Sequence, residues 1–156
     1  GWNYTNKSDL NLEWAKLKDN KVIVFLNSQC PCSQAHFDHL NELQKANKEF
    51  QFIGFHSNKL VDKNVAQKYF DKYKIDFPIF DDIKLVYANE FKALKTPHVF
   101  VLDKDENLLF QGGATNSRRF ASASKFYLKT ALLEINNNKA LNRTVRLISL
   151  LKLRTK

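Results

Sequence analysis

The stretch from Val22 to Lys48 most constrains the fold, because it has the pattern of a buried strand, a short turn and a helix. Val22–Leu26 is a continuous apolar run rich in β-branched residues, which is typical of a strand covered on both faces of a sheet. A turn over Asn27–Gln29 then leads to Cys30. From about Cys32 onward, apolar residues recur at helical spacing, namely Ala35, Phe37, Leu40, Leu43 and Ala46.

The rest of the chain continues this alternation of strands and helices. The predicted strands and helices cover residues 50–55, 62–73, 77–80, about 82–91, 98–102, 108–111 and 121–135, after a loose lead-in over 1–9 and a short helix from Ser8 or Asp9 through Leu17. The early βαβ units predict parallel strands with right-handed crossovers, and the late hairpin adds antiparallel ones. The length of 156 residues fits a single domain over 1–156. The predicted class is therefore α/β, with a mixed sheet flanked by helices.

The two cysteines of the chain, Cys30 and Cys32, indicate chemistry and not a structural framework. A bridge between them closes almost no loop, so it contributes little to stability. Their place at the carboxyl end of a strand and the start of a helix favours a thiolate, because free helix N–H groups and partial positive charge lower a cysteine pKa. Pro31 suits the first helical turn. We therefore expect Cys30 to be the reactive thiolate and Cys32 the candidate resolving thiol.

A disulfide between Cys30 and Cys32 would form a small, strained ring. Strained disulfides are more oxidising and more easily reduced than relaxed ones. Such a site suits a disulfide donor or isomerase better than a reductase.

Thr96 and Pro97 form the second candidate element, directly before the predicted strand His98–Leu102. A proline at the start of a buried strand is most easily accommodated with a cis peptide bond. We therefore predict a cis-proline loop at this position.

Taken together, these segments resemble the peroxiredoxin-like branch of the thioredoxin superfamily, which includes alkyl hydroperoxide reductases, thiol-specific antioxidants and other redoxins. The resemblance covers about residues 20–153 and is carried by Val24–Ser33, Gly54–Asn58, Thr96–Asp103 and Phe110–Gly113. It implies a thioredoxin-like fold with a peroxiredoxin-type insertion between the second strand and the Thr-Pro element. It further implies a thiol–disulfide oxidoreductase or thiol-dependent peroxidase that needs no cofactor. Its partners would be protein thiols and disulfides, or a peroxide. In such folds the Thr96–Pro97 loop faces the cysteine and pairs with the incoming partner.

The chain also departs from the patterns of that branch. Ser33 stands where a Cys-x-x-Cys motif has its second cysteine, and Ile23 and Asn27 stand where peroxiredoxins have Pro and Thr. Ile148 and Ser149 stand where related sequences often have Gly-Cys, so a C-terminal resolving thiol is absent there, naturally or by engineering.

Two other functions stay open at this point. Cys30, Cys32 and His36, with His39 nearby, form a set of soft ligands that suits copper or zinc, so a metal-binding or copper-delivery module of the same fold is the alternative. The other is an interaction module with little turnover. Metal analysis of protein purified without chelator separates the first alternative from the enzyme, and partner binding that survives Cys30→Ser identifies the second.

Charge and termini bear on partners and location. The net charge is +9, and five basic residues without an acid lie in a tail over 140–156 (Arg143, Arg146, Lys152, Arg154 and Lys156). We interpret this tail as a solvated end and expect no nucleic-acid binding, since no aromatic residue lies among those cations.

No apolar run reaches the ~18 residues of a membrane span. The start at Gly1 and the lack of Met predict a removed leader, hence a periplasmic or otherwise extracytoplasmic protein, or else a shortened fragment of a cytoplasmic one. Oligomeric state, substrate and electron donor stay open.

Overall fold

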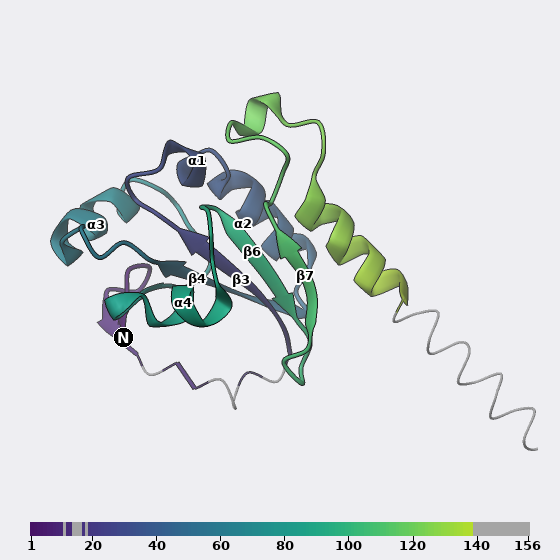
Figure 1. The fold of residues 1–156 in the computed structure, drawn as a ribbon, viewed down its shortest axis with the longest axis horizontal. Coiled ribbons are helices and arrows are strands. Elements are labelled where there is room, and N and C mark those ends of the chain that lie inside the picture. The colour runs from purple at the N-terminus through teal and green to yellow at the C-terminus, as the bar shows by residue number, and fades with distance from the viewer. Residues whose placement is uncertain (11, 14–16, 18, 139–156) are drawn as a thin grey trace, which may run out of the picture.

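The computed structural model describes residues 1–10, 12–13, 17 and 19–138, and its centre is a mixed seven-stranded sheet (Figure 1). The strands are β1 (Trp2–Asn3), β2 (Ser8–Asp9), β3 (Asn20–Leu26), β4 (Phe50–His56), β5 (Ile79–Asp81), β6 (His98–Leu102) and β7 (Leu108–Gly112). The helices are α1 (Pro31–Gln34), α2 (Phe37–Ala46), α3 (Lys63–Phe70), α4 (Val86–Phe91), the 3₁₀ turns η2 (Ile83–Leu85) and η3 (Phe120–Ser122), and a helix over residues 127–138.

The sheet topology brings distant segments to one edge. The strand order is β2-β1-β5-β4-β3-β6-β7, with β3, β4 and β5 parallel and β6 antiparallel to β3. The predicted mixed α/β sheet is thereby confirmed. In the register, Leu26 pairs with His56 and Phe25 pairs with His98. The residues after β3 and those before β6 therefore emerge side by side.

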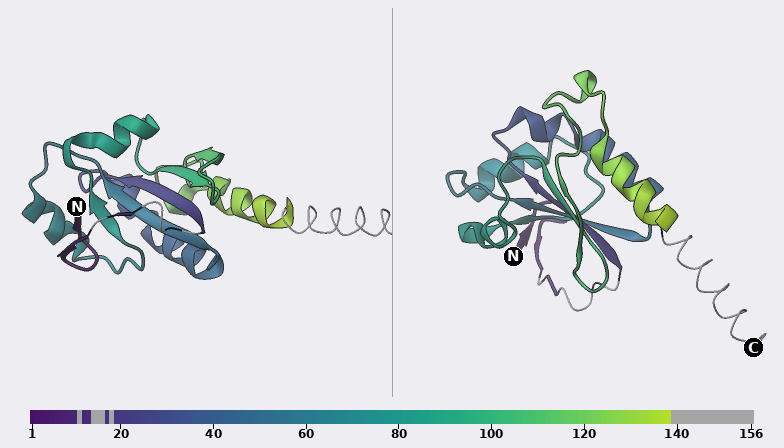
Figure 2. Two further views of the ribbon diagram at one scale, coloured as in Figure 1. Left: turned by 90° about the horizontal axis from the view of Figure 1, so that it is seen from below. Right: turned by 45° about the vertical axis from the view of Figure 1, so that its right-hand side comes forward.

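The alternation of side chains along β3 builds two cores, one on each face of the sheet. Val22, Val24 and Leu26 face a cluster that includes residues of α2, α3 and the helix over 127–138. Ile23 and Phe25 face the opposite cluster, which α4 covers through residues such as Phe91. Figure 2 shows the helix over 127–138 lying along α2. All seven residues of β3 are buried, as expected for a central strand.

The N-terminal segment differs from the prediction of a loose lead-in over 1–9 and a helix through Leu17. β1 and β2 form a hairpin, and Asn3 of β1 pairs with Phe80 of β5. Pairing covers an otherwise open strand edge, which accounts for the order of this segment. Leu12 and Leu17 are not helical but pack against the α4-side core. Trp14 and the basic tail over 140–156, with Ser149, lie outside the described residues.

The helix predicted from about Cys32 to Lys48 is interrupted at Ala35 and His36. The His36 N–H donates to the Ser33 carbonyl at 3.1 Å, in the 3₁₀ pattern. The Cys32 carbonyl, the α-helical acceptor for that N–H, instead receives Nδ1 of the His36 ring at 2.8 Å. The imidazole thus competes with the backbone, and α1 and α2 separate there.

Two further helices differ in extent from the prediction. The helix predicted from Asp81 or Asp82 is split by Lys84 and Leu85, which have left-handed backbones. Asp82 still caps α4, because its carboxylate accepts the Tyr87 and Ala88 N–H groups at 2.9 Å. The helix predicted over 121–135 becomes η3 followed by helix at 127–138. Within the described part of the chain, no helix has the length and apolar character needed to cross a membrane.

Candidate active site

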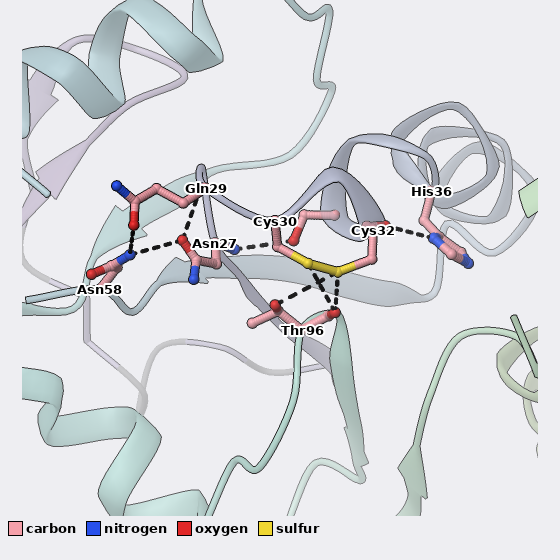
Figure 3. The surroundings of a disulfide bond; sticks show 8 residues. Asn27, Gln29, Cys30, Cys32, His36, Asn58 and Thr96 are labelled. Atoms are coloured by element: carbon pink, nitrogen blue, oxygen red, sulfur yellow. Dashed lines mark hydrogen bonds between the residues drawn. A yellow bond between two sulfur atoms is a disulfide. The ribbon is translucent and has the colours of Figure 1, made fainter. Parts of the chain in front are cut away.

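Cys30 and Cys32 are joined by a disulfide at the edge where β3 ends (Figure 3). Cys30 is the N-cap of α1 with an extended backbone, and its N–H donates to the Asn27 carbonyl at 3.0 Å. Pro31 occupies the first helical turn, where a missing N–H costs nothing. The Cys30 side is half-buried, whereas Cys32 is only 7% exposed. An approaching partner therefore reaches Cys30 first.

The Thr96–Pro97 element lies directly against the disulfide, and its peptide bond is cis as predicted. The Thr96 carbonyl oxygen is 2.8 Å from Sγ of Cys32 and 3.8 Å from Sγ of Cys30. The Thr96 hydroxyl lies 4.0 Å from Sγ of Cys32. The four residues predicted to form the site thus lie together, because the sheet register places the start of β6 beside the end of β3.

Ser33, which occupies the usual position of a second cysteine, has a structural contact here. It is fully buried, and its hydroxyl accepts the Asn27 N–H at 3.1 Å. Asn27 in turn accepts the Gln29 N–H at 2.9 Å and the Asn58 side-chain amide at 3.0 Å (Figure 3). These bonds fix the turn that presents Cys30. Ser33 therefore stabilises the loop and contributes no sulfur to the site.

His36, the histidine of the alternative metal site, is buried next to Cys32 with both ring nitrogens engaged (Figure 3). Nδ1 donates to the Cys32 carbonyl, and Nε2 pairs with the Thr115 hydroxyl at 2.8 Å. His39 packs against Phe120 with ring centroids 4.8 Å apart, and burial is the main cause that lowers its pKa. Among the described residues, no group of three or more His, Cys, Asp and Glu side chains is arranged to hold a metal ion.

A second histidine network supports the loop from the β4 side. His56 is buried at the end of β4, and its Nε2 lies 3.0 Å from the Ser28 hydroxyl. Nδ1 of the same ring lies 3.9 Å from Oδ1 of Asp81. The His56 imidazole is the main influence that holds the pKa of Asp81 below its ordinary range. The network ties the turn before Cys30 to β4 and β5.

Two clefts flank the disulfide. One has a volume of about 640 Å³ and is lined by the cysteines, the Thr96–Pro97 loop and residues 113–118, and the other has a volume of about 460 Å³. Lys95, Arg118 and Arg119 contribute the cations of these walls. The sequence shows Arg118 and Arg119 after a Gly-Gly turn, but only the fold places that turn beside Cys30.

We expect the stability of the protein to fall in mild acid because of His98, which follows Pro97. Its Nδ1 accepts the Leu94 N–H at 3.1 Å, and burial, followed by the charge of Lys95, lowers its pKa below the ordinary 6.5. Between the lowered value and 6.5 the unfolded chain binds more protons than the folded one. This contribution is therefore complete above pH 6.5 and is lost as the pH falls, by at most about 1.4 kcal/mol per pH unit.

Denaturant unfolding from about pH 7.5 to about pH 5.5 measures this dependence. His98→Gln, which stays neutral, should show a flatter profile than the parent protein, and the remaining slope should include His39, whose pKa is also lowered. Equal slopes for both proteins would show that His98 does not titrate in this range.

Comparisons with known proteins give a matching family and similar folds. The family model described as Redoxin matches residues 4–126. A putative thiol:disulfide interchange protein DsbE from Chlorobium tepidum superposes with a TM-score of 0.63 at 22% identity, covering 76% of this chain and 81% of that one. A secreted Mycobacterium tuberculosis disulfide oxidoreductase homologous to Escherichia coli DsbE gives 0.60 at 18% identity, covering 75% and 82%.

A third similar structure is an uncharacterized conserved protein from Geobacillus kaustophilus, with a TM-score of 0.66 at 22% identity. The alignment covers 75% of this chain and 66% of that one. No curated protein sequence matches the chain at a significant level.

Proposed function

Because the chain belongs to the redoxin family, and is thereby an oxidoreductase, we propose that it exchanges disulfides with protein thiols through Cys30 and Cys32. The observation that carries the proposal is the Cys30–Cys32 disulfide at the strand-to-helix edge, facing the Thr96–Pro97 loop. The similarity to disulfide oxidoreductase structures supports the fold on which this chemistry depends.

The oxidising half of the cycle begins with a thiolate of the partner. It attacks Sγ of Cys30, the more exposed sulfur, which forms a mixed disulfide and releases Cys32 as a thiolate that takes up a proton. A second partner thiolate then attacks the partner's own sulfur, forms the partner's disulfide and releases Cys30. The partner loses two electrons, and the Cys30–Cys32 pair gains them. The reverse sequence reduces a partner disulfide, with Cys32 resolving the intermediate on Cys30.

The contacts of the two sulfurs support this division of roles. Once reduced, the Cys32 thiol can donate to the Thr96 carbonyl oxygen, which lies 2.8 Å from its sulfur. That contact favours the protonated form of Cys32, whereas Cys30 is farther from the carbonyl, at 3.8 Å. Cys30 therefore acts as the attacking thiolate and Cys32 waits as the resolving thiol.

The direction of transfer follows from the spacing of the cysteines. With only Pro31 between them, the disulfide closes a smaller ring than a Cys-x-x-Cys motif does. A smaller ring is harder to form, so we propose that the protein donates its disulfide to partner thiols. An oxidising, extracytoplasmic compartment suits such a donor.

Redox equilibration tests the proposal. The protein is incubated in dithiothreitol buffers of graded potential, its free thiols are alkylated, and the products are weighed by mass spectrometry. We expect one transition between a form with both cysteines alkylated and a form with neither, at a potential above that of thioredoxin, about −270 mV. A reduced protein that binds stoichiometric copper or zinc, and loses it in Cys32→Ser, would instead support the metal alternative. Failure of the disulfide to form at any potential would refute the proposed function.

A further inference from the structure

The two clefts beside the disulfide share a wall, and we refer to the pair as the groove. Cys30, Cys32 and Arg118 line both of them. The larger continues along Lys95 and the Thr96–Pro97 loop, and the smaller along Gln34 and Arg119. A small disulfide would fill one cleft, whereas an extended chain can enter through one and leave through the other. The shape of the groove therefore fits a polypeptide segment whose cysteine lies at its midpoint.

The charge of the groove has a single sign. Its cations are Lys95, Arg118 and Arg119, all with exposed side chains. None of the described residues that line either cleft is Asp or Glu, and no described carboxylate lies within ion-pair distance of these three cations. Cations without local counter-ions attract an anionic partner and raise its rate of association.

We propose that the partner of this protein is an acidic polypeptide segment, in which the reacting cysteine is flanked by Asp or Glu. This inference rests on the proposed function and specifies its substrate class. Carboxylates on either side of the partner cysteine would meet Lys95 in one cleft and Arg119 in the other, with Arg118 between them. Leu94, which is 88% exposed at the mouth of the larger cleft, offers an apolar contact to the same segment.

Stopped-flow exchange with matched peptides tests the inference. Three dithiol peptides of equal length carry Glu, Gln or Lys beside a cysteine, and each reduces the oxidised protein at low salt. We expect the Glu peptide to react about tenfold faster than the Gln peptide and the Lys peptide more slowly, with the differences shrinking as salt screens the charges. Arg118→Gln should reduce the Glu-to-Gln rate ratio about threefold or more.

The control variant is Lys104→Gln. Lys104 lies in the exposed loop after β6, at the end of that strand opposite the disulfide. The variant removes the same charge from the molecule and should leave the Glu-to-Gln ratio unchanged. Equal rates for the Glu and Gln peptides, or equal effects of Lys104→Gln and Arg118→Gln, would overturn the inference and leave the oxidoreductase intact. A dependence on Arg118 that appears only with reduced glutathione would show that the groove takes a small anionic thiol. Failure of every thiol to reduce the protein would instead refute the proposed function.

Discussion

Cys30→Ser is expected to lower the rate of disulfide exchange by about a thousandfold or more, because it removes the sulfur that attacks and is attacked. The partly exposed Cys30 is the sulfur that a partner can reach, whereas Cys32 is buried against the Thr96 carbonyl. The measurement is the rate at which the reduced protein opens a peptide disulfide. The folded state should be retained, since serine is close to cysteine in size and the disulfide closes almost no loop.

Cys32→Ser is the matched variant and should behave differently. Cys30 still attacks the partner, but nothing resolves the intermediate, so a mixed disulfide on Cys30 accumulates and is detected by mass spectrometry. Should Cys30→Ser trap the partner and Cys32→Ser stay inert, the two roles would be reversed. Should both variants retain the parent rate, the chemistry would lie elsewhere.

The part of the fold that the sequence predicts is the part whose burial leaves a pattern of apolar residues along the chain. Val22–Leu26 and Val99–Leu102 are apolar throughout because both faces of the sheet are covered there, and both strands form as predicted. The hairpin of β1 and β2 has strands of two residues each, too short for any period to show. It depends on pairing with β5, a contact between segments some 75 residues apart that local propensity does not encode.

The candidate site likewise has a part that the sequence predicts and a part that only the fold reveals. Cys30 and Pro97 were predictable in place, because each sits at the junction of a recognisable strand. Arg118 was visible as a cation, but its position beside Cys30 follows from how the loop after β7 folds back over the sheet edge. The part played by His36 was hidden, because a histidine within a helical pattern does not reveal that its ring will take a backbone carbonyl from the helix.

His36→Leu is expected to destabilise the oxidised protein by about 2–4 kcal/mol. Leucine keeps a buried side chain of similar bulk but leaves the Cys32 carbonyl and the Thr115 hydroxyl without the ring nitrogens that they now contact at 2.8 Å. Each buried polar group that loses its partner costs about 1–3 kcal/mol. The Thr115 hydroxyl keeps its contact with the Ser117 carbonyl at 3.0 Å, so its share of the loss should be the smaller one.

Thr115→Val isolates that share, and the double variant completes a thermodynamic cycle measured by denaturant unfolding. If the two side chains act through their mutual bond, the double variant loses less stability than the sum of the single variants, by about 0.5–3 kcal/mol.

One rearrangement would reduce the effect of His36→Leu. With the imidazole gone, the N–H of residue 36 can turn to the Cys32 carbonyl and join α1 to α2 in one continuous helix. A loss below about 1 kcal/mol would indicate that joining, and it would show that the His36 ring is what keeps the helix of the cysteines separate from α2.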